Sequence, residues 1–295
     1  MQNKSMNNDT YGKVYLVGAG PGAADLITVR GAKLLEQAQI VFHDALVEPE
    51  MLDLCPHAIK VPIGKRCGKL SSAQHFINKR LVDAAKQYKT VVRLKGGDPM
   101  LFGRADEELQ ALKLAGISVE VVPGITAALA GAASIQQSLT LRGVSRSVAF
   151  ITLAQGSENL VAGQPMSNPN ADTLVYYMGR KDAAKIALQL IGHNAHHGAN
   201  TPVQILEAVS TSRERQWIGT LAELAAGKAD TWFDSGSPAL IVIGEALEPK
   251  ILHSTLHSTL HSTLHATLPE LQSSSPEIND GLQDSGTLSH SRRRA

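Results

Sequence analysis

Short apolar runs that alternate with segments of helical spacing are the feature that most constrains the fold of this chain. Between residues 12 and 247 each run is only a few residues long and rich in β-branched and apolar residues, which favours buried strands. The runs interpreted as strands are Val14–Val17, Ile40–Phe42, Ile59–Val61, Val91–Leu94, Val119–Val122, Val148–Thr152, Thr173–Tyr177, Val203–Leu206, Gln216–Gly219 and Ala239–Ile243. Strands that alternate with helices predict an α/β fold with mostly parallel sheets, each covered by helices on both faces.

Two of the helices can be placed from their spacing and their end signals. Residues 73–88 have helical periodicity, and Ser71 with Gln74 forms a plausible capping box in front of them. Residues 105–115 form another helix, because three acidic residues in its first turn suit the positive end of its dipole. Gly116 is placed to end this second helix.

The alternation is interrupted at Pro123-Gly124, after which a second α/β series begins. A chain of 295 residues exceeds the usual domain size of about 100–200 residues, so we expect two domains. The expected organisation is a flexible leader at 1–11, an N-terminal α/β domain at 12–123, a C-terminal α/β domain at 124–247 and a low-complexity, disordered tail at 248–295.

The tail repeats Leu-His-Ser-Thr from Leu252 to about Thr267. A period of four places His253, His257, His261 and His265 on one slowly drifting helical stripe, which is compatible with a metal-binding helix. Low complexity favours the simpler interpretation of a repeat-expanded segment outside the catalytic part of the chain. We therefore predict no metal site.

Composition and charge exclude several classes of protein. The net charge is +1, with 43% hydrophobic and 19% charged residues, so neither nucleic acid nor a membrane surface is an expected partner. The first dozen residues lack the apolar core of a signal peptide, and no apolar run approaches the roughly 18 residues that span a bilayer. We expect a cytoplasmic protein in which both cysteines, Cys55 and Cys67, are reduced.

Two glycine-rich loops predict a small-molecule cofactor site. The first, Gly18–Ala23, follows the first strand and fits Gly-x-Gly-x-x-Gly/Ala, with Asp44 placed after the second strand as a ribose ligand would be. This pattern favours an NAD-linked oxidoreductase. Two features oppose it: Pro21 removes a backbone donor, and residues 25–28 delay the start of the next helix.

The second loop, Lys95-Gly96-Gly97-Asp98-Pro99, is more specific. Adjacent glycines at the end of a strand let backbone approach a ligand, Asp98 accepts hydrogen bonds, and Pro99 stiffens the exit from the loop. Because ligands of open α/β sheets bind at the carboxyl ends of the strands, we expect both loops to face one crevice.

The order and spacing of several blocks resemble those of the tetrapyrrole methylases, and within them the uroporphyrinogen-III C-methyltransferases. The resemblance covers about residues 12–247. The blocks that carry it are Gly18–Gly22, Asp44-Ala45-Leu46, Gly64-Lys65-Arg66, Arg93–Arg104, Pro123–Ala128 and Tyr177-Met178-Gly179.

The resemblance implies a homodimer of two-domain chains that hold S-adenosylmethionine in the cleft between their domains. The implied reaction is methylation of uroporphyrinogen III at C2 and C7, which gives precorrin-2 by way of precorrin-1. The implied cofactor contacts are Pro21, Gly96, Gly97, Asp98, Leu101, Thr126, Ala127 and Met178. Most of them offer backbone groups, although Met178 would use its side chain unless it is an ordinary core methionine.

The resemblance also implies the residues that handle protons and substrate. Asp44 corresponds to a proton acceptor and Lys65 to a donor, while Arg104 is a further catalytic candidate. Because arginine keeps its proton at physiological pH, we prefer Arg104 as a ligand of a substrate carboxylate, together with Arg66 and Arg142. Glu107 and Glu108 most simply begin a helix, or one of them binds pyrrole nitrogens.

Three segments depart from the family pattern, namely Thr140–Val144, Ile151–Ala154 and Val209, which stands where a glycine is usual. All three lie in the second half, so the departures leave the cofactor half intact and put the substrate contacts in question. A sibling methylase that acts on a later precorrin, and a cofactor-binding protein without turnover, therefore stay open as alternatives.

Overall fold

The computed structural model describes residues 11–63, 70–153, 170–193 and 196–248. Within them the strands are β1 Lys13–Gly18, β2 Ile40–His43, β3 Ile59–Pro62, β4 Thr90–Lys95, β5 Val119–Val122, β6 Val148–Thr152, β7 Thr173–Tyr177, β8 Pro202–Glu207, β9 Arg215–Thr220 and β10 Ala239–Ile243. The helices are α1 Val29–Glu36, α2 Leu70–Ala85, α3 Ala105–Leu114, α4 Ala127–Ser134, α5 Ala183–His193 and α6 Leu221–Ala225. Each predicted strand is confirmed, with ends that differ by a residue or less.

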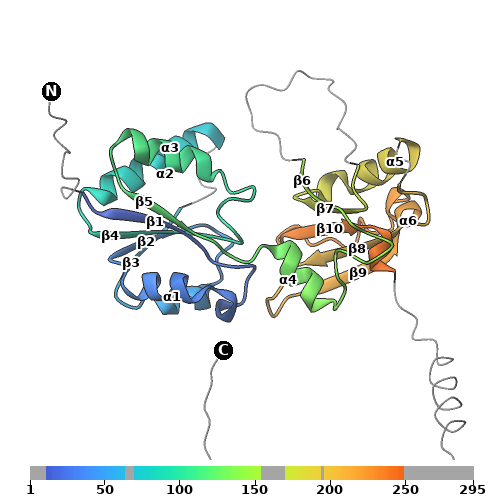
Figure 1. The fold of residues 1–295 in the computed structure, drawn as a ribbon, viewed down its shortest axis with the longest axis horizontal. Coiled ribbons are helices and arrows are strands. Elements are labelled where there is room, and N and C mark those ends of the chain that lie inside the picture. Colours follow the sequence, from blue (N-terminus) through green and yellow to red (C-terminus); the bar gives the residue numbers. More distant parts are fainter. Residues whose placement is uncertain (1–10, 64–69, 154–169, 194–195, 249–295) are drawn as a thin grey trace, which may run out of the picture. The chain divides into compact units, whose positions relative to one another are not determined.

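The first sheet has the order β3-β2-β4-β1-β5, and all of its pairings are parallel (Figure 1). Successive residues of its strands face opposite layers. Val91 packs in the layer that holds α2 and α3, whereas Val92 packs in the layer that holds α1. This sheet confirms the predicted mixed α/β class and the mostly parallel arrangement, and both of its faces are covered.

The second sheet has the order β6-β7-β10-β8-β9, and here the predicted direction is wrong. Only β6 and β7 are parallel; β7–β10, β10–β8 and β8–β9 are antiparallel. Only residues 208–214 join β8 to β9, and a parallel crossover needs about a dozen residues or more. Helix α4 covers one face of this sheet and helices α5 and α6 cover the other (Figure 1).

The predicted ends of α3 agree with the structure, whereas the predicted start of α2 does not. Helix α3 begins at Ala105 and ends before Gly116, whose φ of +69° is the left-handed conformation expected of a terminating glycine. Helix α2, in contrast, includes Ser71, so the predicted capping box is wrong. Its first turn contains Ser71 and Ser72, of which we had interpreted Ser71 as a cap in front of the helix.

Both sheets belong to one compact unit that ends at Glu248. The domain boundary near residue 123 stays a prediction; it falls in the connection between β5 and α4. The leader, Lys65, Arg66, Cys67 and the histidine repeat lie outside the described residues.

Candidate active site

Three glycines from separate segments meet backbone to backbone at the carboxyl edge of the first sheet. A Cβ atom on Gly18, the last residue of β1, would lie 2.6 Å from Gly124 Cα and 2.7 Å from the carbonyl oxygen of Gly97. Gly20 and Gly97 exchange two backbone hydrogen bonds, at 3.2 and 2.7 Å. The two predicted glycine-rich loops are thus joined to each other and to the connection that leads into α4.

Asp98 uses its side chain to hold this junction. Its Oδ1 accepts from the amide of Met100 at 2.8 Å, and its Oδ2 accepts from the amide of Gly124 at 2.9 Å. The turn-capping role is therefore present. Each carboxylate oxygen has a second lone pair, so a ligand contact remains available to the same group.

The loop after β1 also contacts the loop after β8. The amide of Ala23 donates to Ser210 Oγ at 3.1 Å, and a Cβ on Gly22 would lie 2.6 Å from Thr211 Cγ2. Val209, which precedes Ser210, is buried and packs on the α4 side of the second sheet. Segments from both halves of the described chain therefore border the same region.

Tyr177, at the end of β7, holds the start of α4. Its hydroxyl shares a hydrogen bond of 2.6 Å with Thr126 Oγ1 and accepts from the amide of Ala128 at 3.2 Å. Burial raises the pKa of the Tyr177 hydroxyl, so this group stays protonated at neutral pH. Thr126 in turn lies beside the second loop, because a Cβ on Gly97 would be 3.9 Å from Thr126 Cα.

Met178 follows Tyr177 and is 55% exposed, with a left-handed φ of +57°. A core role for this methionine is therefore excluded. The ring of Phe102, from the loop after β4, lies 5.1 Å from the ring of Tyr177. The loops that follow β4 and β7 thus present apolar side chains together.

Strained backbone gathers at these strand ends. In the described part of the chain, six non-glycine residues have left-handed φ, and five of them lie in the loops that follow β4, β7 and β8; these five are Phe102, Arg104, Met178, Ala208 and Ser210. A non-glycine residue in this region costs of order 1–3 kcal/mol, and such residues cluster at functional sites. The left-handed residues after β4 and β7 lie in predicted motifs, and those after β8 lie in the loop that contacts Gly22 and Ala23.

Asp44 lies just after β2 at the same edge of the first sheet. Its Oδ1 accepts from the amide of Leu46 at 3.1 Å, and its Oδ2 accepts from the amide of Gly96 at 3.3 Å. The side chain is 26% exposed, so it reaches solvent while its orientation is fixed. The role of Asp44 as a proton acceptor stays a prediction.

Beneath Asp44 lies a group of buried charges that the sequence analysis missed. Arg93 and Lys95, two residues apart on β4, both form ion pairs with Glu108 of α3, at 3.1 and 3.0 Å. Burial, and next the charge of Arg93, lowers the pKa of Lys95. We name Arg93, Lys95 and Glu108 the Arg93 cluster. In the sequence, this cluster could have been suspected from two cationic residues two positions apart in a largely apolar strand.

Comparison with known proteins identifies the family. The model of the family described as tetrapyrrole (corrin/porphyrin) methylases matches residues 13–225. The chain belongs to this family. This membership makes the chain a methyltransferase and replaces the oxidoreductase that the first loop alone favoured.

Individual relatives share most of the described chain. A siroheme synthase from Pseudomonas fluorescens (strain SBW25) is 44% identical over 239 residues, which are 80% of this chain and 50% of that protein. The chain thus spans about half the length of the curated relatives it matches. A uroporphyrin-III C-methyl transferase from Thermus thermophilus, solved with S-adenyl homocysteine, is 36% identical with a TM-score of 0.68, over 80% of this chain and 94% of that one. A cobalt precorrin-4 methyltransferase of cobalamin biosynthesis is 28% identical with a TM-score of 0.66, over 80% and 96%.

The contacts above join the segments that carry the residues predicted to touch the cofactor. Pro21 follows Gly20 in the first loop, and the amide of Leu101 bonds to the carbonyl of Asp98 at 3.3 Å. Thr126 and Ala127 begin α4, which Tyr177 joins to Met178. Their roles stay predictions, but the fold brings their segments to one place.

The arginines predicted to bind substrate differ in their surroundings. Arg104 forms a bidentate ion pair with Glu107, at 2.6 and 2.8 Å, and is 41% exposed. Arg142 is exposed in a turn closed by hydrogen bonds between Leu141 and Ser145, and its guanidinium has no hydrogen bond or ion pair with another described residue. No interaction of the described residues joins Arg142 to the glycine-rich loops.

The departures from the methylase pattern have local explanations. Val209 lies between two left-handed residues, and its side chain contributes to the core over α4. Leu153 packs against the other face of the second sheet. These two substitutions therefore serve packing, whereas Val144 is 46% exposed beside Arg142 and alters the surface.

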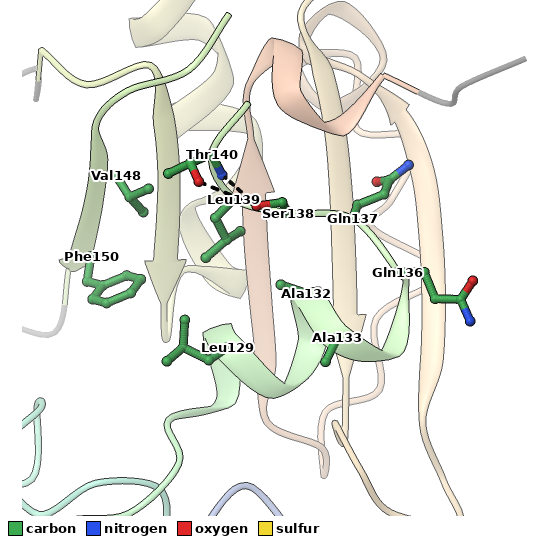
Figure 2. Close-up of a pocket in the computed structure, with 10 residues that line it drawn as sticks. All are labelled: Leu129, Ala132, Ala133, Gln136, Gln137, Ser138, Leu139, Thr140, Val148 and Phe150. Carbon is green, nitrogen blue, oxygen red and sulfur yellow. Dashed lines mark hydrogen bonds between the residues drawn. The ribbon is translucent and has the colours of Figure 1, made fainter. Parts of the chain in front are cut away.

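A separate hollow of about 480 Å³ lies over α4, the segment after it and β6 (Figure 2). Its lining is formed by Leu129, Ala132, Ala133, Gln136, Gln137, Ser138, Leu139, Thr140, Val148 and Phe150. None of the predicted site residues lines it. In the described part of the chain, no helix is long and apolar enough to cross a bilayer.

Proposed function

We propose that this methylase transfers methyl groups from S-adenosylmethionine to C2 and C7 of uroporphyrinogen III, giving precorrin-2 by way of precorrin-1. The observation that carries the proposal is the likeness, at 36% identity over 80% of the chain, to a uroporphyrin-III C-methyl transferase solved with S-adenyl homocysteine. The contacts between the loops after β1 and β4, and between the end of β7 and the start of α4, support the proposal because they bring the predicted motifs together.

The character of the loops fits this cofactor. The Gly20–Gly97 junction brings main chain close to the crevice without side chains, and Met178 and Phe102 add exposed apolar surface. A nucleoside with an amino acid tail needs both kinds of surface. We assign its contacts to Pro21, Gly96, Gly97, Asp98, Leu101, Thr126, Ala127 and Met178, in the cleft between the two predicted domains.

The substrate carries eight carboxylates, so its recognition requires cations around the crevice. We assign this role to Arg104 and Arg142, and to Arg66 outside the described residues. Arg104 is already paired with Glu107. A substrate carboxylate must therefore share this guanidinium or displace Glu107, which favours a ligand with several negative charges over one with few.

Methyl transfer requires that the methyl donor be aligned with the pyrrole carbon and that the ring lose one proton. Bound S-adenosylmethionine supplies an electrophilic methyl group to the pyrrole carbon. Holding the two reactants in line contributes much of the rate. Asp44 takes the proton that the ring loses, since its carboxylate is exposed at the crevice and held by the amides of Leu46 and Gly96. Lys65 is the proposed proton donor.

A sibling methylase that acts on a later precorrin is the second candidate. The likeness to a cobalt precorrin-4 methyltransferase, at 28% identity and a TM-score of 0.66, favours it. So does the altered surface at Val144, beside the retained Arg142. We further propose a homodimer, which a measurement of molecular mass in solution tests.

An anaerobic assay of the purified full chain with uroporphyrinogen III and S-adenosylmethionine tests the proposal. Mass spectrometry should resolve a product with one added methyl group that is converted into one with two. Calorimetry with S-adenosylhomocysteine runs in parallel. Binding without methylated product refutes the substrate assignment and favours the sibling methylase or a protein without turnover. Tight binding of NAD with none of S-adenosylhomocysteine would refute the cofactor.

A further inference from the structure

The Arg93 cluster is almost completely removed from water. The side chains of Arg93, Lys95 and Glu108 are 5%, 4% and 0% exposed, although a buried ion without compensation is costly. Glu108 accepts from Arg93 through one oxygen and from Lys95 through the other. One carboxylate therefore serves two cations, and one positive charge is left to be compensated.

Asp44 supplies that compensation. The Arg93 Nε donates to Glu108, its Nη1 donates to the carbonyl of Leu94 at 2.9 Å, and its Nη2 lies 4.0 Å from Asp44 Oδ2. Because Glu108 and the main chain fix the other two nitrogens, the planar guanidinium directs its third nitrogen at Asp44. With Asp44 included, two cations face two carboxylates.

The same Asp44 oxygen also accepts from the amide of Gly96 at 3.3 Å. Gly96 belongs to the loop that joins Gly20 and contacts Thr126, so the position of Asp44 is tied to the position of that loop. Arg93 and Gly96 therefore hold one carboxylate oxygen of Asp44, and the amide of Leu46 holds the other at 3.1 Å, while the side chain stays 26% exposed.

We propose that Arg93 is a positioning residue for methyl transfer, which acts by fixing the position of the Asp44 side chain as the proton acceptor, while Glu108 holds Arg93 in place. This role rests on the proposed function. It concerns a buried residue that does not reach the substrate, and it predicts that the effect of Arg93 passes through Asp44 alone.

The test is a double-mutant cycle on the full chain with Arg93→Met and Asp44→Asn. Arg93→Met should lower kcat at least about tenfold, a part of what a well-placed acid or base contributes. KM for uroporphyrinogen III and the Kd for S-adenosylhomocysteine should stay within about twofold, because only proton transfer is affected. In the Asp44→Asn background, Arg93→Met should lower kcat no further.

A conservative variant and a control variant help to interpret the double-mutant cycle. Arg93→Lys keeps the positive charge but lacks the planar guanidinium, so its kcat should lie between those of Arg93→Met and the wild type. Glu120→Gln removes an ion pair with Lys13 near the amino ends of β1 and β5 of the same sheet, and should leave kcat unchanged. If Arg93→Met does not fold, as thermal unfolding will show, Arg93→Lys replaces it in the same cycle, with a smaller expected loss.

The outcomes separate the two proposals. A further loss in the Asp44→Asn background, or a rise in KM with an unchanged kcat, overturns the positioning role while the wild-type chain still methylates uroporphyrinogen III. A wild-type chain that yields no methylated tetrapyrrole overturns the proposed function first, and the positioning role with it.

Discussion

Replacing Gly18 by Ala tests whether the backbone junction at the carboxyl edge of the first sheet sets the geometry of the site. The added Cβ would lie 2.6 Å from Gly124 Cα, where an ordinary contact begins at about 3.4 Å. One of the two segments must therefore move by about 0.8 Å, since both contacts are backbone and no side chain can swing away. Gly18 has an ordinary φ, so the effect is purely steric.

The size of the effect follows from this displacement. Overpacking of a well-packed site costs about 1–3 kcal/mol, which lowers the Tm of a unit this large by roughly 2–12 °C. A misplacement near 1 Å at a catalytic site costs on the order of a hundredfold in rate. We expect a lower Tm by calorimetry, weaker binding of S-adenosylhomocysteine by titration, and lower kcat in the methyl-transfer assay.

Gly192→Ala is the matched control. Gly192 lies in α5 with nothing within 4 Å of the added Cβ, and alanine is the better helix former by up to about 1 kcal/mol. This variant should be as stable as the wild type or slightly more so, with unchanged binding. A Gly18→Ala chain with wild-type Tm and wild-type affinity would refute the argument that the junction is rigid.

Two further predictions concern Asp98 and His197. Asp98→Ala should lower stability by about 1–3 kcal/mol and weaken binding of S-adenosylhomocysteine, because the Gly124 amide loses its acceptor; an unchanged Tm on thermal unfolding would contradict this. Burial lowers the pKa of His197 in the folded chain. Below about pH 6.5 this histidine is therefore protonated in the unfolded chain but stays neutral in the folded chain. Denaturant unfolding should therefore show stability falling toward pH 5 by up to about 1.4 kcal/mol per pH unit, and His197→Gln should remove that part of the fall.

Much of the fold was predictable because strand formation depends on local pattern. The strand directions of the second sheet were not, although the short connection at 208–214 already required β8 and β9 to be antiparallel. Loop length limits direction, whereas apolar runs do not report it. The start of α2 was missed because Ser71 was interpreted as a cap, whereas the helix already begins at Leu70.

The candidate site also has a part that the sequence predicted and a part that it did not. Motif order placed Asp98, Thr126 and Met178 in loops that the fold does join. It did not show that Glu108, read as the start of a helix, is buried between two cations. Long-range ion pairs depend on which helix crosses which strand, and a single sequence does not contain that crossing.

The left-handed residues after β4, β7 and β8 have a consequence for protein engineering. Ala208 holds a conformation that glycine adopts without steric strain, so random selection for heat resistance should find glycine there early, whereas Ser210 also accepts a hydrogen bond from the amide of Ala23. Where a side chain is retained in spite of this, thermostability and turnover are in competition. Libraries screened for temperature alone would then drift toward robust chains that methylate poorly, and a screen for both properties would leave Met178 unchanged.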